Sequence, residues 1–143
     1  MSKLIKDITS ILLNQSVQVV RLVGNSLILY LNCHPGEKKG FSLWLEPVWN
    51  FKSDIEVITG SRQAQTEDEE EHKIVMDKLN RIINKKITEI NIEAISNDLI
   101  IRFEDRYFIS TFVSDPNDEE SWIIRDLKTG IRLIGNPKSI KEI

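Results

Sequence analysis

The chain has 143 residues and a formal net charge of −3 at pH 7, with 41% hydrophobic and 29% charged residues. This composition excludes a disordered or fibrous chain and suits one domain, residues 1–143, with its own core. The weak negative charge argues against a dedicated nucleic-acid binder, which usually shows a basic face.

The single cysteine, Cys33, excludes an intrachain disulfide and indicates a reducing compartment, so we expect a cytoplasmic protein. No stretch approaches the roughly 20 apolar residues of a membrane-spanning helix. The apolar residues within 1–14 are interrupted by polar ones, unlike the core of a signal peptide. We therefore expect no membrane association.

The first half of the chain is predicted to form one helix and five strands. Ser2 is expected to cap a helix over residues 3–14, where apolar residues recur at helical spacing. Gly24-Asn25 predicts a hairpin, since both residues tolerate positive φ. Pro47 lacks a backbone N–H and should interrupt the ladder between the third and fourth strands with a bulge or kink. The expected strands span residues 17–23, 26–32, 41–46, 48–52 and 55–58.

A second helix is predicted after residues 61–67, a connection without an apolar pattern. Thr66 and Glu69 form a capping-box pattern at its start. The acidic run Glu67–Glu71 in its first turns and Lys85-Lys86 in its last would complement the helix dipole. Its buried stripe is expected to contain Val75, Leu79, Ile82 and Ile83.

The second half continues with strands separated by turns. Asn97-Asp98, Asp105-Arg106 and Lys128-Thr129-Gly130 are expected turns, and residues 114–120 an acidic loop. The expected strands span residues 87–95, 99–104, 107–113, 122–125 and 131–134.

The two halves resemble each other in sequence. Val23–Leu31 is echoed by Ile95–Phe103, and Trp49 is echoed by Trp122. We therefore predict an α+β fold made of an internally duplicated unit, a helix followed by antiparallel strands, with repeats at 1–61 and 66–143. The two copies would complete one core around an approximate two-fold axis, with two helices packed on sheet and both tryptophans as core anchors.

No motif in the chain indicates catalysis or a metal site. Cys33 and His34 are neighbours and would point in opposite directions on a strand end, while the only other histidine is His72. Asp115 opens a loop with calcium-like spacing, but Glu120 stands where the loop needs glycine. Nucleotide-binding loops and hydrolase elbows are missing from the sequence. We expect no enzyme, no metal and no cofactor.

The candidate partner-binding residues are two in a strand and four in the acidic loop. Alternation along residues 41–46 places Trp44 and Glu46 on the face opposite Leu43, which favours exposure of Trp44 as an interface anchor, although an inward core position stays open. The loop candidates are Asp115, Asp118, Glu119 and Glu120. Acidic groups speed encounter with a basic partner, but they also cap helices and keep surfaces soluble.

Several segments together resemble a broad group of small bacterial proteins, largely uncharacterised, some of which are similar to toxin-immunity proteins. The segments are Leu43–Trp49, Ile58–Ser61, Asn97–Asp105 with the following strand, and Glu120-Ser121-Trp122. The likeness spans residues 20–126, and the chain departs from the group's pattern at Asn50, Arg62-Gln63 and Arg106. The resemblance implies an immunity-type function and brings no catalytic residues with it.

The leading hypothesis is a non-enzymatic, cytoplasmic bacterial binding protein, in its most specific form an immunity protein that occludes a basic toxin. The alternative is a small-ligand or regulatory module with an aromatic-lined pocket between the two halves. An enzyme of unrecognised type is third. The predicted two-fold axis also leaves a homodimer open.

Overall fold

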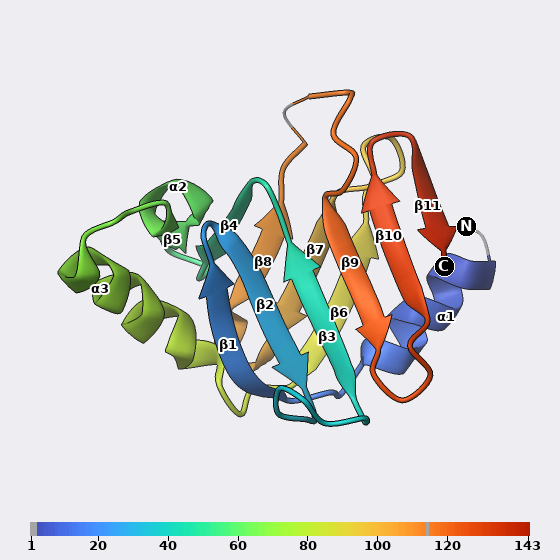
Figure 1. The fold of residues 1–143 in the computed structure, drawn as a ribbon, viewed down its shortest axis with the longest axis horizontal. Helices are drawn as coiled ribbons and strands as arrows, with labels where there is room; N and C mark the ends of the chain where they lie inside the picture. Colours follow the sequence, from blue (N-terminus) through green and yellow to red (C-terminus); the bar gives the residue numbers. More distant parts are fainter. Residues whose placement is uncertain (1–2, 114) are drawn as a thin grey trace.

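The computed structural model describes residues 3–113 and 115–143, which form two antiparallel sheets and three short helices (Figure 1). The predicted α+β class is confirmed at this level. The cap at Ser2 and the loop residue Ser114 lie outside the described residues, as do the side chains of residues 3–5.

The six-stranded sheet combines strands from both ends of the chain. Its strand order is β1 (Val17–Val23), β2 (Ser26–Leu31), β3 (Phe41–Leu45), β9 (Trp122–Asp126), β10 (Arg132–Asn136) and β11 (Ser139–Glu142). β3 and β9, which are far apart in sequence, pair in register from Phe41↔Asp126 to Leu45↔Trp122.

The five-stranded sheet also mixes the two halves. Its order is β5 (Val57–Gly60), β4 (Trp49–Lys52), β8 (Phe108–Thr111), β7 (Leu99–Phe103) and β6 (Ile87–Ile92). β3 and β4 therefore belong to different sheets, and the chain crosses between them at Pro47. The prediction of a bulge or kink within a single ladder is wrong. Proline has no N–H to donate to a ladder, so strand pairing stops at Pro47, and the chain passes there from one sheet to the other.

Two buried tryptophans lie in the core between the sheets. Trp49 and Trp122 are 1% and 0% exposed, as their assignment to the core predicted. Each indole N–H donates to a hairpin carbonyl: Trp49 Nε1 to Asn25 O at 2.6 Å, and Trp122 Nε1 to Asn97 O at 2.8 Å. Both large side chains are thus buried with their polar atom satisfied.

The helices lie at the two ends of the molecule in Figure 1. α1 (Lys3–Leu12) packs against β6, whereas α3 (Glu69–Leu79) packs against β1 and β5 and against the short α2 (Ser61–Ala64). α2 falls in the segment 61–67 that the sequence left without structure. One turn of helix is too short for a periodic signal, although its Ala64 is buried.

The predicted capping box at Thr66 is wrong. Asp68 is the N-cap of α3, and its side chain accepts hydrogen bonds from the N–H groups of Glu70 and Glu71. Thr66 Oγ1 instead accepts a hydrogen bond from the N–H of Asp68 at 3.1 Å. Thr66 thus helps to position Asp68, the residue that caps the helix. The acidic first turn is retained.

Helix α3 ends earlier than predicted, and the strand that follows is shorter. A 3-10 turn (Asn80–Ile82) follows α3, and Asn84 adopts a positive φ of 68°, so Lys85-Lys86 lie beyond the helix. β6 stops at Ile92 because the Glu93 carboxylate accepts the N–H groups of Ile95 and Ser96, which closes a turn.

Two strands at the sheet edges differ from the prediction. β5 is shifted to Val57–Gly60, and β11, which pairs with β10, was not predicted. A second 3-10 turn (Glu104–Arg106) occupies the predicted turn at Asp105-Arg106, where both residues have positive φ. Short edge strands of mixed polarity give little alternation, so their positions are set by pairing with the neighbouring strand.

Candidate functional site

One face of the six-stranded sheet carries a row of apolar side chains. Leu27, Leu43 and Trp122 point into the core, so the alternate residues of the same strands point away from it. Successive cross-strand partners make a row across all six strands, here called the outer row: Arg21, Ile28, Trp44, Ile123, Ile134 and Lys141. Four apolar residues thus lie between two cationic ends.

No helix of the described part of the chain lies in front of this face. In Figure 1 the six-stranded sheet is turned toward the viewer, with α1 and α3 at its ends. Ile28 is buried beneath its neighbours, whereas Trp44, Ile123 and Ile134 remain partly exposed. We call this side of the sheet, centred on the outer row, the open face. The alternation argument that turned Trp44 away from the core is confirmed.

The five-stranded sheet provides an internal comparison for the outer row. The corresponding row on its outer face, here called the matching row, consists of Asn91, Ile100, Ser110, Asn50 and Gly60. Ser110 Oγ donates to Asn50 Oδ1 at 2.9 Å, so the centre of this row is polar and internally satisfied. This outer face has apolar residues too, Ile100 in the row and Phe108 beside it. The two central positions, Ser110 and Asn50, are nevertheless polar where the outer row has Trp44 and Ile123.

Two predicted site residues lie together at one border of the open face. Ser26 Oγ donates to Glu46 Oε2 at 2.6 Å, which holds the Glu46 carboxylate beside the outer row. The pKa of Glu120 is raised above its usual value, mainly by burial and secondly by the neighbouring Glu46 carboxylate, while Arg132 lowers it. Sequence reasoning selected both glutamates but gave no reason for them to meet.

The opposite border of the open face is basic. Arg125 and Arg132 are cross-strand partners, and Ser42 is the next partner along the same line. The apolar row is therefore flanked by both carboxylates and guanidinium groups, and the Arg132 guanidinium also acts on the Glu120 carboxylate. A partner that covers the open face would meet both signs of charge.

The remaining loop candidates are Asp115, Asp118 and Glu119, and the last two lie near Lys141 at one end of the outer row. Asp115 Oδ1 accepts the N–H of Asn117, and the carbonyl of Glu119 accepts from Asn136 Nδ2 at 3.1 Å. Asp118 Oδ2 is buried and has no hydrogen-bond partner in the described structure. Asp118 and Glu119 line a shallow hollow against the turn between β10 and β11, together with Lys138 and Lys141.

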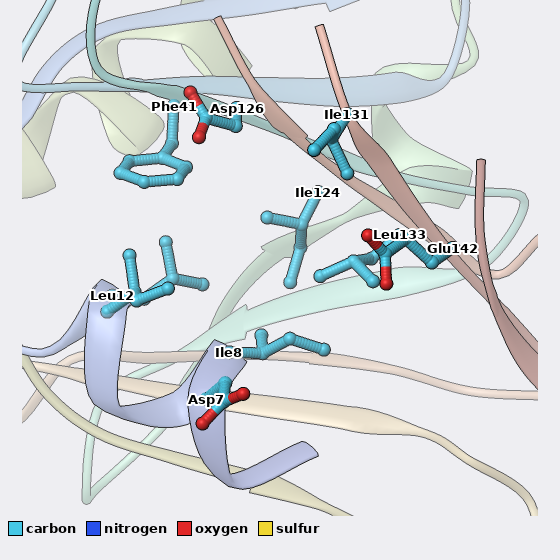
Figure 2. A pocket seen from close by; sticks show the side chains of 10 residues that line it. Asp7, Ile8, Leu12, Phe41, Ile124, Asp126, Ile131, Leu133 and Glu142 are labelled. Atoms are coloured by element: carbon cyan, nitrogen blue, oxygen red, sulfur yellow. The ribbon is translucent and has the colours of Figure 1, made fainter. Parts of the chain in front are cut away.

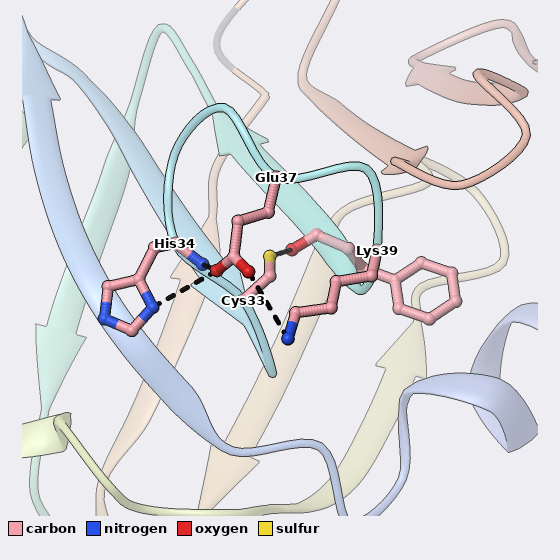
Figure 3. A network of polar contacts seen from close by, with 5 residues as sticks. Cys33, His34, Glu37 and Lys39 are labelled. Atoms are coloured by element: carbon pink, nitrogen blue, oxygen red, sulfur yellow. Dashed lines mark hydrogen bonds and ion pairs between the residues drawn. The ribbon is translucent and has the colours of Figure 1, made fainter.

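The segment around Cys33 is a structural loop (Figure 3). Glu37 accepts the backbone N–H of His34 at 2.6 Å, and its carboxylate pairs with His34 Nδ1 and Lys39 Nζ at 3.3 Å each. Cys33 is buried, its Sγ lies 3.6 Å from Phe41 O, and burial raises the pKa of its thiol. A buried, protonated thiol is a poor nucleophile.

A cleft lies between α1 and the inner side of the six-stranded sheet (Figure 2). Its residues come from 7–12 and 41 in the first half and from 124–142 in the second, and its aromatic lining residue is Phe41. The sequence suggested, as an alternative, a pocket between the two halves, but it indicated none of these residues. The apolar residues of the cleft carry an ordinary core pattern, and only the position of α1 relative to β9 and β10 leaves space among them.

Comparison with protein-family models, with curated proteins and with solved structures finds no match to this chain. Within residues 3–113 and 115–143, no three His, Cys, Asp or Glu side chains are placed to hold a metal ion. None of the helices in the same residues is long and apolar enough to cross a membrane.

Proposed function

We propose that this chain is a protein-binding module whose docking surface is the open face. The contrast between the outer row and the matching row carries the proposal. Two sheets with corresponding strand pairing differ in that one has the partly exposed Trp44 and Ile123 where the other has Ser110 and Asn50. A partly exposed tryptophan with aliphatic neighbours and a charged rim is the arrangement typical of an interface centre.

We propose that the partner places a basic group against Glu46 and Glu120. The pKa of Glu120 is raised because its carboxylate is partly desolvated and lies beside that of Glu46. A cationic group of the partner would stabilise the ionised form of both carboxylates. Arg125 and Arg132 on the opposite border would then contact acidic groups of the same partner. Charges arranged in this way select the partner and its orientation and accelerate its encounter.

In its most specific form the proposal is a bacterial immunity protein that covers the working surface of a basic toxin. It would act in the cytoplasm, where the single buried thiol of Cys33 stays reduced. This function requires no chemistry on the protein's own part. Occlusion of the toxin by the open face would be sufficient.

The experiment compares two double variants as bait in a lysate of the native host. Trp44→Glu with Ile123→Glu places charge at the centre of the open face, and Ser110→Glu with Ile100→Glu places the same charge on the matching row. We expect the wild type and the second variant to retain one stoichiometric basic protein that the first variant loses. Retention by the first variant, or equal loss from both when both are folded, would contradict the proposal.

We also infer that the fold is an internal duplication with approximate two-fold symmetry. The strand orders support this inference: β1, β2 and β3 are followed in their sheet by β9 and β10, and β6, β7 and β8 are followed in theirs by β4 and β5. The indole hydrogen bonds of Trp49 and Trp122 to corresponding hairpin carbonyls support it as well. The duplication supplies the matching row as the natural control for the outer row.

A further inference from the structure

A cleft lies under α1 because α1 has no short helix packed beside it within the described residues, whereas α3 has α2. α3 packs against β5 with the help of α2, which follows β5 directly. β10 is instead followed by the strand β11, so no short helix packs beside α1 in the corresponding place. A volume of about 240 Å³ remains between α1 and the inner side of β9 and β10.

The interior of the cleft is apolar. Ile8 and Leu12 of α1 face Phe41, Ile124 and Leu133 of the sheet across the space in Figure 2. Ile11 and Ile131, which are 51% and 44% exposed, also line the cleft, so its lining reaches the solvent. Such a lining favours an aliphatic group of modest size.

The polar lining of the cleft is entirely acidic. Its three polar residues are Asp7, Asp126 and Glu142, and the described residues that line it include no lysine or arginine. Oδ1 of Asp126 accepts the N–H groups of Lys128 and Thr129, which fixes that carboxylate in place. The three carboxylates lie on different sides of the cleft, with Asp126 beside Phe41, Glu142 beside Leu133 and Asp7 beside Ile8 (Figure 2). A ligand with an aliphatic chain in the cavity and a cationic group at its edge would therefore meet negative charge on each of these sides.

We propose that the cleft binds a small organic cation of the alkylammonium class. The alkyl chain lies among Ile8, Ile124 and Leu133, and the ammonium group lies at the edge of the cleft, where Asp7, Asp126 and Glu142 supply negative charge. The site is on the inner side of the sheet that carries the open face on its outer side. It is therefore separate from the proposed partner surface and does not depend on that proposal.

The test titrates the protein with n-alkylammonium ions of increasing chain length, and with n-alkanoates and n-alcohols of equal length, by calorimetry and NMR. We expect alkylammonium affinity to rise about fourfold per added methylene until the cavity is filled. Alkanoates should not bind, and alcohols should bind more weakly than the ammonium ions. The largest chemical-shift changes should fall on Ile8, Ile124 and Leu133. Equal affinity for all three head groups, or changes located elsewhere, would overturn the proposal.

Two variants separate the contributions of charge and cavity. Asp7→Asn with Glu142→Gln should weaken alkylammonium binding about tenfold while leaving alcohol binding unchanged. Ile131→Trp, at an exposed position of the lining, should abolish binding of both. Glu69→Gln with Asp77→Asn on α3 removes the same net charge far from the cleft and should leave both affinities unchanged. A loss in this control equal to that of the first variant would overturn the site assignment.

Discussion

Trp44 and Trp122 occupy neighbouring strands but opposite faces of one sheet, and this difference predicts how their removal affects stability. Trp122 is 0% exposed, packs over Gly135, and donates its indole N–H to Asn97 O at 2.8 Å. Replacing it with alanine removes roughly 150–250 Å² of buried aromatic surface and leaves a cavity. A cost of about 3–5 kcal/mol is expected. That is a large part of the total stability of a domain, about 5–15 kcal/mol.

Trp44→Ala should cost much less. Trp44 is partly exposed on the open face, so its removal opens a surface depression that water fills, and no closed cavity results. A loss of about 1 kcal/mol is expected for such a position. Urea denaturation followed by far-ultraviolet circular dichroism gives both values, because tryptophan fluorescence would be changed by the substitutions themselves. If Trp44→Ala cost as much as Trp122→Ala, Trp44 would be a core residue and the open face would lose its proposed anchor.

Three further predictions concern packing, charge and the halves of the chain. Gly135→Ala should destabilise the fold by about 1–3 kcal/mol in the same urea assay, because a Cβ there would overlap the indole of Trp122; an unchanged midpoint would refute this packing. Burial and a neighbouring carboxylate raise the folded-state pKa of Glu120, so its ionisation costs stability as the pH rises through that pKa. Glu120→Gln should therefore stabilise the protein at pH 7 and have less effect at pH 4, and the opposite order would contradict the assigned environment. Fragments 1–64 and 66–143 should each be unfolded alone and fold when mixed, by circular dichroism, since each supplies strands to both sheets; independent folding of either would contradict this.

Single strands, turns and helix faces were predictable because the residue pattern that specifies each of them lies within a short segment of the sequence. The strand at 17–23 and the hairpin at Gly24-Asn25 were predicted with the correct boundaries. The buried side chains of Val75, Leu79 and Ile82 were predicted from helical spacing. In each case a few adjacent residues determine the result.

The arrangement of the sheets was not predictable from the pattern. β3 pairs with β9, although the two strands are far apart in the sequence, and the residues of neither strand specify the other as its partner. Alternation placed Trp44 on the outer side, but Ile123 belongs to a continuous apolar run that does not distinguish the two sides of a sheet. The proximity of Glu120 to Glu46 depends on the course of a loop, and the cleft depends on the gap beside α1.

The most direct test of the open face is site-specific photo-cross-linking in the native host. A benzoylphenylalanine replaces Ile123 in the outer row or, in a matched protein, Ile100 in the matching row. The account predicts that position 123 yields one discrete covalent adduct with a basic protein and that position 100 yields none. An adduct of equal strength from position 100, or none from position 123 in a folded protein, would contradict the assignment of the open face as the docking surface.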